Sequence, residues 1–301
     1  MPKYVVIVGA GEIGSAVAAL IKPSHVHIEE WDKDLSKVPK QKPLAKIVPE
    51  ADVIFLCIPS WHLRDGVAEI RTFLKKKTLV ISLSKGIELG TRLTVDGLLA
   101  ATLPQRQPFA LISGPMLAEE LMEGLPTGAV VATKRRADFA RVSALFKKSP
   151  LRLSWSQDVR GTALAGVLKN AYALTLGIAD AIPLGANAKG WLVERAVGEM
   201  IGIIRLLNRS GNAVETATGP AGLGDLVATG SSPYSSNFTV GRELVAGKGI
   251  TKMSEGFISL PSLLALLGRN AKKFPLLQTV ARIVIEKKDA KRAFAAFTRN
   301  G

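Results

Sequence analysis

Residues 4–14 read YVVIVGAGEIG and decide the fold of the first half of the chain. Residues 5–8 are apolar without alternation, which is typical of a parallel strand covered on both faces. Gly9, Gly11 and Gly14 follow at once with the spacing G-x-G-x-x-G, and residues 15–21 have the small, apolar pattern of a helix. In such a strand–turn–helix the glycines permit the tight turn, the approach of a pyrophosphate and close helix packing. The stretch therefore predicts a dinucleotide-binding loop at a helix N-terminus.

The residue that ends the next expected strand, residues 25–31, is Asp32. An acid about 20 residues after the glycines accepts hydrogen bonds from a ribose 2′-hydroxyl and repels a 2′-phosphate. This predicts NAD as the cofactor, with NADP as the alternative. Glu12 and Ile13 lie inside the loop, and a carboxylate beside a pyrophosphate is unfavourable unless it points outward. A turn that holds no nucleotide is the structural alternative.

The rest of the chain divides into an alternating half and a helical half. Further strands are expected at residues 53–58, 79–83, 110–112 and 129–132. The connection between Asp32 and Asp52 is short. Helices are then expected at residues 158–180, 188–208, 215–229, 237–246, 262–267 and 276–287, and the basic tail from Lys287 is expected to fray. The pattern predicts an α/β fold, with an N-terminal doubly wound Rossmann sheet in residues 1–155 and an all-α substrate domain in residues 156–301.

Composition limits the class of protein. The chain has 301 residues, 47% of them hydrophobic, which excludes disorder and fibrous folds. Its net charge of +15 favours anionic partners. The one cysteine, Cys57, excludes an internal disulfide and favours a reducing compartment. The longest apolar stretch, residues 163–182, carries Lys169, Asn170 and Asp180 and reads as a buried helix, so we expect a cytoplasmic protein without a membrane span.

Three segments carry candidate catalytic groups. Residues 84–88 read SKGIE and follow a buried strand, where an open α/β sheet forms its ligand crevice. Residues 168–170 read LKN and place Lys169 in an apolar helix, where burial favours the neutral amine and suits it to proton transfer. Residues 222–226 read GLGDL and offer Asp225 after a glycine turn. The bland alternatives are a solvated strand-end lysine, a helix lysine that reaches solvent and a helix-capping Asp.

Taken together, these segments resemble the NAD(P)-dependent glycerol-3-phosphate dehydrogenase family, of the 6-phosphogluconate dehydrogenase-like superfamily. The resemblance rests on motifs that occur in the family's order along nearly the whole chain: GAGEIG at Gly9, CIPS at Cys57, SKGIE at Ser84, SGP at Ser113, DVRG at Asp158, LKN at Leu168, NAK at Asn187, GLGDL at Gly222, SN at Ser236 and EG at Glu255. It implies an oxidoreductase that interconverts dihydroxyacetone phosphate and glycerol 3-phosphate, serves glycerophospholipid biosynthesis and forms a homodimer.

The resemblance also implies roles for individual residues. Lys169 matches the proton donor and acceptor, Lys85 the lysine that contacts substrate and cofactor, and Asp225 the acid that orients them. Pro59, Ala118 and Glu255 match cofactor contacts, beside the loop residues and Asp32. The implied substrate set is Lys85, Gly114, Met116, Lys169, Asn170, Asp225, Thr229, Ser235, Ser236 and Asn237. No metal is implied.

The chain departs from the family at the substrate side. The family reads SRN where residues 235–237 read SSN, so Ser236 replaces an arginine that binds the substrate phosphate. A serine cannot make that charge-assisted bidentate contact. Met116 replaces a hydroxyl residue, and Ala163 stands where a glutamate is usual. Another cation could substitute for the arginine, and the candidates are Lys189, Arg242 and Lys248.

Two rival functions follow from these observations. A dehydrogenase of the same architecture could act on a different small hydroxy or keto substrate, as Met116 and Ser236 suggest. A nucleic-acid-binding or regulatory protein on a retained dinucleotide fold would explain the positive charge. The basic residues are scattered, however, and the four tryptophans form no stacking pattern, so we expect a small anionic substrate, such as a phosphorylated triose, and no nucleic acid.

Overall fold

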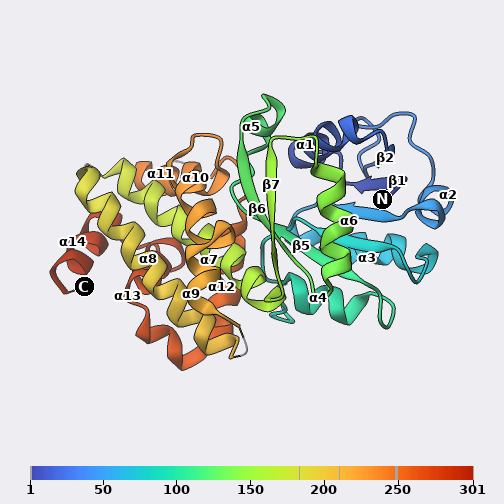
Figure 1. The fold of residues 1–301 in the computed structure, drawn as a ribbon. Coiled ribbons are helices and arrows are strands. Elements are labelled where there is room, and N and C mark those ends of the chain that lie inside the picture. The colour runs from blue at the N-terminus through green and yellow to red at the C-terminus, as the bar shows by residue number, and fades with distance from the viewer. Residues whose placement is uncertain (1, 183, 210, 248–249, 301) are drawn as a thin grey trace. The chain divides into compact units, whose positions relative to one another are not determined.

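The computed structural model describes residues 2–182, 184–209, 211–247 and 250–300 (Figure 1). The chain forms two compact units. The first runs to Lys85 and continues from Leu93 to Ala163, and the second contains Gly86–Arg92 and the chain from Leu164 onward. The predicted boundary between residues 155 and 156 stays a prediction.

The first unit is built on one seven-stranded sheet. Its order is β2-β1-β3-β4-β5-β6-β7, and every neighbouring pair is parallel except β5 and β6. Among the described strands β2 stands at the edge of the sheet, and a short connection joins it to β3. The strands are β1 (Tyr4–Val8), β2 (His27–Trp31), β3 (Val53–Leu56), β4 (Leu79–Ser82), β5 (Phe109–Ser113), β6 (Thr127–Ala132) and β7 (Leu151–Ser156).

Helices cover both faces of this sheet. One buried core joins α1 and α6 to the side chains of one face, and a second core joins α3 and α4 to the other. The helices are α1 (Glu12–Ile21), α2 (Leu44–Ile47), α3 (Leu63–Ile70), α4 (Val95–Thr102), α5 (Ala118–Met122) and α6 (Arg136–Phe146), with 3₁₀ turns at Lys22–Ser24, Val48–Glu50, Ser60–His62 and Arg71–Phe73. Because both faces are covered, the strands are apolar without alternation. The doubly wound Rossmann fold is confirmed.

From Leu164 onward the described part of the second unit is helical, as predicted. The helices are α7 (Val159–Ala181, which starts in the first unit), α8 (Gly185–Leu207), α9 (Ala213–Thr218), α10 (Asp225–Ser231), α11 (Ser236–Ala246), α12 (Glu255–Leu267), α13 (Pro275–Val284) and α14 (Ala290–Asn300), with a π-helical turn at Pro220–Gly224 and a 3₁₀ turn at Gly268–Lys273. By length and composition α7 could cross a membrane, yet its apolar window is wholly buried. It is the core helix of this unit.

Three expectations about secondary structure were wrong. The helix expected over residues 215–229 is interrupted, because Gly219 is extended and Pro220 has no N–H to continue the ladder. The tail expected to fray forms α14, because Phe294 and Phe297 are buried along one face. Strand β7 was not expected, although its alternating pattern in residues 151–156 is typical of a half-exposed strand.

Candidate functional site

The glycine loop has the geometry that a dinucleotide needs. Gly9 has a φ of +100°, and a Cβ atom there would lie 2.5 Å from the carbonyl oxygen of Cys57. A Cβ on Gly14 would collide with the carbonyl oxygen of Gly9, which explains the close packing of α1 on the turn. A Cβ on Gly11 would meet no atom within 4 Å, so the backbone at the start of α1 is open to an approaching pyrophosphate. These residues fit the cofactor.

Asp32 lies against this loop and is held in place from two sides. Its carboxylate accepts a hydrogen bond from the Ala10 amide at 2.8 Å, and Lys37 approaches the same oxygen at 3.4 Å. Gln41 bonds both the amide and the carbonyl of Asp32, at 2.7 and 2.9 Å. Sequence analysis missed Gln41, whose position in a loop gave no signal. The acid is thus fixed at the end of β2 beside the loop.

Glu12 is exposed and is the first residue of α1. A carboxylate in the first turn stabilises a helix through its dipole, and the same charge opposes a bound pyrophosphate. We therefore expect Glu12→Gln to lower the Kd for NADH about threefold and to lower the Tm slightly. Fluorescence titration with NADH checks the first effect. Glu120→Gln, an exposed first-turn acid of α5, is the control. An unchanged Kd would mean that the Glu12 carboxylate points away from the cofactor.

The other first-unit candidates follow the carboxyl ends of neighbouring parallel strands. Pro59 follows β3, Lys85 follows β4, and Gly114 follows β5. The Lys85 ammonium donates to the Gly114 carbonyl at 3.2 Å, and the Ser84 hydroxyl donates to the Ile58 carbonyl at 2.6 Å. The predicted residues at this sheet edge therefore converge, as ligand-binding residues do in open α/β sheets.

Two side chains near this edge are less directly placed for chemistry. Met116 precedes α5 and Ala118 is its first residue. Both are partly buried and pack against the core of one sheet face.

Cys57, the residue after β3, is buried, and burial raises the pKa of its thiol far above the ordinary range. The thiol therefore stays protonated and packs as an apolar side chain.

In the second unit, Lys169 and Asp225 form a buried ion pair. The Lys169 ammonium lies 2.8 Å from the Asp225 carboxylate, and the two residues are 3% and 1% exposed. The interruption at Gly219 and Pro220 makes Asp225 the first residue of α10, where its charge also suits the helix dipole. Charges this deeply buried are costly, so a pair of this kind is a good candidate for function.

Amide groups from three helices form a hydrogen-bond network, and one of them belongs to the residue after Lys169. The Asn237 side chain donates to the Asn170 side chain at 2.9 Å and accepts from the Gly256 amide at 2.8 Å. Asn170 is adjacent to Lys169 in α7, and Gly256 follows Glu255, the first residue of α12. The network thus ties the first turns of α11 and α12 to the middle of α7, next to Lys169.

The remaining predicted substrate residues lie at the start of α11 and within α10. Ser235 caps α11 by accepting from the Phe238 amide at 3.3 Å, and Ser236 is the first residue of that helix. The Thr229 hydroxyl donates to the Asp225 carbonyl at 2.5 Å. Three buried hydroxyls that sequence analysis did not single out find no hydrogen-bond partner in the described part of the chain: those of Thr175 in α7, of Ser113, before Gly114, and of Ser254, before Glu255. The last two could have been found. Their signal was their position inside the SGP motif and in front of EG.

The cations suggested as substitutes for the missing arginine are engaged elsewhere. Lys189 and Arg242 both pair with Asp180, at 2.5 and 3.5 Å. Asp180 is 11 residues beyond Lys169 on α7, which places it about 16 Å along the helix. Neither cation therefore stands at the ion pair. Lys248 lies outside the described residues.

Glu199 of α8 is a buried carboxyl group that joins three helices. It accepts from the Tyr172 hydroxyl at 2.7 Å and from the amides of Leu276 and Leu277 at 2.6 and 3.0 Å, so it caps α13. Desolvation raises the pKa of Glu199 above its ordinary value of 4.5, although these hydrogen bonds oppose the shift. Burial also raises the pKa of Tyr172, which keeps its hydroxyl a donor.

This raised pKa makes stability depend on pH. The folded state retains the Glu199 proton when the unfolded state has lost it, so the contribution of Glu199 is full below pH 4.5 and is lost as the pH rises through the folded-state pKa. We expect Glu199→Gln to remove this decline from the free energy of unfolding, measured with urea across that range. Glu194→Gln, an exposed acid of the same helix, should follow the wild type. Parallel curves for Glu199→Gln and wild type would contradict the assignment.

Comparison with known proteins supports one family. Its two sequence profiles, described as the NAD-dependent glycerol-3-phosphate dehydrogenase N-terminus and C-terminus, match residues 35–139 and 158–295. A glycerol-3-phosphate dehydrogenase [NAD(P)+] of Gluconobacter oxydans is 32% identical over 93% of this chain and 92% of its own. One from Streptomyces griseus is 39% identical over 81% and 74%. The crystal structure of glycerol-3-phosphate dehydrogenase from Coxiella burnetii superposes with a TM-score of 0.87, 26% identity and 99% coverage of both chains.

A Rossmann unit with an open glycine loop, joined to a helical unit with a buried Lys–Asp pair, defines an NAD(P)-linked oxidoreductase acting on a CH–OH group. The chain belongs to the NAD-dependent glycerol-3-phosphate dehydrogenase family.

Proposed function

We propose that the chain interconverts dihydroxyacetone phosphate and glycerol 3-phosphate by hydride transfer, with NAD as its cofactor. The observation that carries the proposal is the buried pair of Lys169 and Asp225, 2.8 Å apart in a family whose curated relatives are named for this substrate. An ammonium held this far from bulk water is suited to hand a proton to a carbonyl oxygen as negative charge develops there.

When bound, NADH supplies the hydride. Gly9, Gly11, Gly14 and Asp32 would hold it, and Pro59, Ala118 and Glu255 are proposed as further contacts. Lys169 gives its proton to the substrate oxygen in the reducing direction and takes it back in the other. Asp225 keeps the ammonium oriented and balances its charge. Lys85, at the end of β4, supplies a second cation for the developing oxyanion, and Asn170, Asn237, Gly114, Met116 and Thr229 are proposed to shape the substrate site.

The rival substrate remains a specific alternative because Ser236 replaces an arginine. The first turn of α11 offers a phosphate the Ser236 hydroxyl and backbone amides, while Lys189 and Arg242 pair with Asp180 and the Arg242 guanidinium also lies 5.9 Å from the ring of Phe238. Loss of a charged hydrogen bond weakens binding about tenfold or more. We therefore propose a higher KM for the phosphorylated substrate than an intact SRN segment would give.

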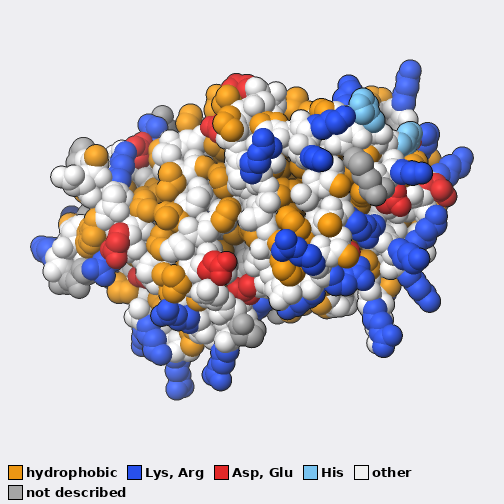
Figure 2. Space-filling view, viewed as in Figure 1, with side chains coloured by type: hydrophobic (Ala, Val, Ile, Leu, Met, Phe, Trp, Pro, Cys, Tyr) orange, Lys and Arg blue, Asp and Glu red, His pale blue; other side chains and the backbone are white. Residues whose placement is uncertain are grey.

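The test is a panel of substrates, with turnover of each measured by the change in NADH absorbance. Dihydroxyacetone phosphate, unphosphorylated dihydroxyacetone and other small keto compounds are compared, together with Ser236→Arg. Turnover confined to the phosphorylated triose, with a lower KM in Ser236→Arg, supports the proposal. Equal turnover of the unphosphorylated compound would favour the rival substrate. In the view of Figure 2, Lys and Arg lie mainly over the right part and at the lower left, with hydrophobic and uncharged side chains between them.

The choice of NAD is tested at Asp32. Its carboxylate repels a 2′-phosphate, while Lys37 beside it attracts one. We expect Asp32→Asn, which keeps an acceptor for the Ala10 amide, to shift the ratio of kcat/KM toward NADPH by about tenfold or more, and Lys37→Gln to shift it the other way. An unchanged ratio in both variants would overturn the assignment.

A cytoplasmic homodimer that serves glycerophospholipid biosynthesis is also proposed, from the family resemblance and the apolar helices of the second unit. Light scattering behind size-exclusion chromatography measures the oligomeric state, and a monomer would exclude this part of the proposal.

A further inference from the structure

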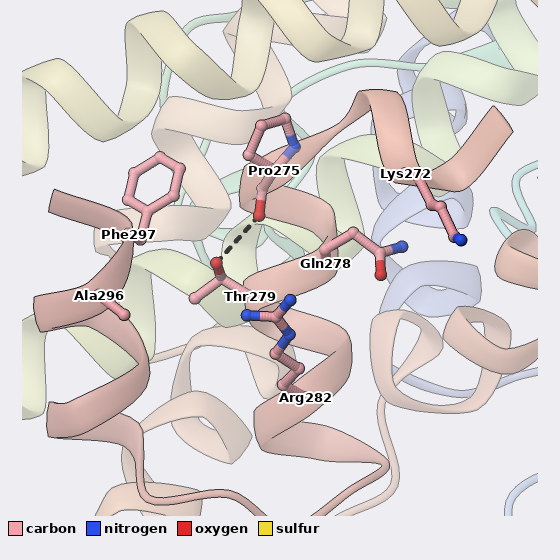
Figure 3. A pocket seen from close by; sticks show the side chains of 7 residues that line it. All are labelled: Lys272, Pro275, Gln278, Thr279, Arg282, Ala296 and Phe297. Atoms are coloured by element: carbon pink, nitrogen blue, oxygen red, sulfur yellow. Dashed lines mark hydrogen bonds between the residues drawn. The ribbon is translucent and has the colours of Figure 1, made fainter. Parts of the chain in front are cut away.

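A cavity lined by none of the candidate site residues discussed above lies at the last two helices of the chain. Residues 268–301 contain nine Lys or Arg and only two Asp or Glu, so this short segment carries much of the net charge of +15. The cavity has a volume of about 470 Å³ and is formed by the 3₁₀ turn before α13, by α13 and by α14 (Figure 3). That volume is typical of a site for a small molecule.

The polar side of the cavity is rich in hydrogen-bond donors. Lys272, Gln278 and Arg282 line it, and no carboxylate does. Figure 3 shows Arg282 reaching toward Thr279, with Gln278 and Lys272 to one side. The Thr279 hydroxyl already donates to the Pro275 carbonyl at 2.9 Å. Across the described chain, no acid lies within ion-pair distance of Lys272 or Arg282, so both cations remain available to a ligand.

The opposite side of the cavity is apolar. Phe297 and Ala296 come from α14, and the Pro275 ring begins α13. Phe297 is 6% exposed, and its ring lies 5.3 Å from that of Trp191 on α8. Its position is therefore fixed by packing, and Trp191 reports on what touches it.

We propose that this cavity binds a small organic phosphate, with the phosphate on Lys272 and Arg282 and the carbon skeleton against Phe297. A guanidinium offers two parallel donors to a phosphate, and a second cation matches its double negative charge. A ligand with a charged end and an uncharged body is complementary to a cavity with a cationic side and an apolar side. The site lies within the second unit and is separate from the Lys169–Asp225 pair.

Calorimetric titration with phenyl phosphate, and with inorganic phosphate for comparison, tests the proposal on the whole protein. We expect Lys272→Gln/Arg282→Gln to weaken phenyl phosphate binding about tenfold or more, while KM for the triose substrate is unchanged. Arg269→Gln/Lys273→Gln removes the same two kinds of charge from neighbouring exposed positions outside the lining, and should bind like the wild type. Equal binding by all three proteins, or equal loss in both variants, would overturn the proposal.

A variant that keeps every charge tests the cavity itself. Ala296→Leu fills part of it and should weaken phenyl phosphate more than inorganic phosphate, whereas Ala295→Leu, on the exposed side of α14, should weaken neither. Phenyl phosphate should also change the fluorescence of the wild type and not of Trp191→Phe. Unaltered binding in Ala296→Leu would exclude the cavity. Because these readouts do not use turnover, failure here is distinguishable from failure of the proposed reaction.

Discussion

Substitution of Lys169 by methionine is expected to lower kcat about a thousandfold, since general acid catalysis by one positioned side chain contributes on that order. Methionine has a similar length and fills the same space in α7, but it has no proton to give. The residue is 3% exposed, so water cannot readily take the place of its side chain at the substrate oxygen. NADH binding should change little, because the glycine loop and Asp32 belong to the other unit.

Three measurements separate this effect from simple loss of structure. Steady-state kinetics give kcat, NADH titration gives cofactor binding, and circular dichroism verifies the fold. Lys42→Met is the matched control, since Lys42 also forms an ion pair, with Glu29, but on the surface of the first unit. Turnover within about tenfold of wild type in a folded Lys169→Met protein would remove Lys169 from the role of proton donor.

The sequence predicted those parts of the site that depend on neighbouring residues. The order strand, glycines, helix is local, and it placed Gly9, Gly11 and Gly14 as the structure does. Asp32 could be predicted because a parallel neighbour of β1 must end at the same edge of the sheet. By contrast, Gln41 holds Asp32 from an irregular loop, and a loop of that kind carries no periodic signal.

Contacts between distant segments could not be derived from spacing. Lys169 and Asp225 are 56 residues apart, and Asn237 bridges Asn170 to Gly256 across three helices. Only the resemblance to a family brought the first pair together before the structure did. The missed helix α14 shows the opposite error. Its many charges suggested fraying, while the spacing of Phe294 and Phe297 already described one apolar face that packing could order.

The partner of Lys169 provides the second large effect. Asp225→Asn leaves the ammonium buried without its counter-ion, and breaking a buried pair in this way costs about 3–5 kcal/mol of stability. The proton donor also loses the group that orients it, so we expect kcat to fall about a hundredfold as well. Asp180→Asn is the control. Asp180 is a partly exposed acid on α7, the helix of Lys169, and losing its ion pairs with Lys189 and Arg242 should cost about 1 kcal/mol or less.

The double variant Lys169→Met/Asp225→Leu distinguishes a catalytic pair from a structural one. Two apolar side chains remove both buried charges, so stability should recover most of what Asp225→Asn loses, while turnover should stay as low as in Lys169→Met. Urea unfolding and kcat measured on the wild type, Lys169→Met, Asp225→Leu and the double variant complete the cycle. If the double variant were stable and active, the pair would serve only the fold. If it regained stability without activity, then the chain tolerates two buried charges because the reaction requires them.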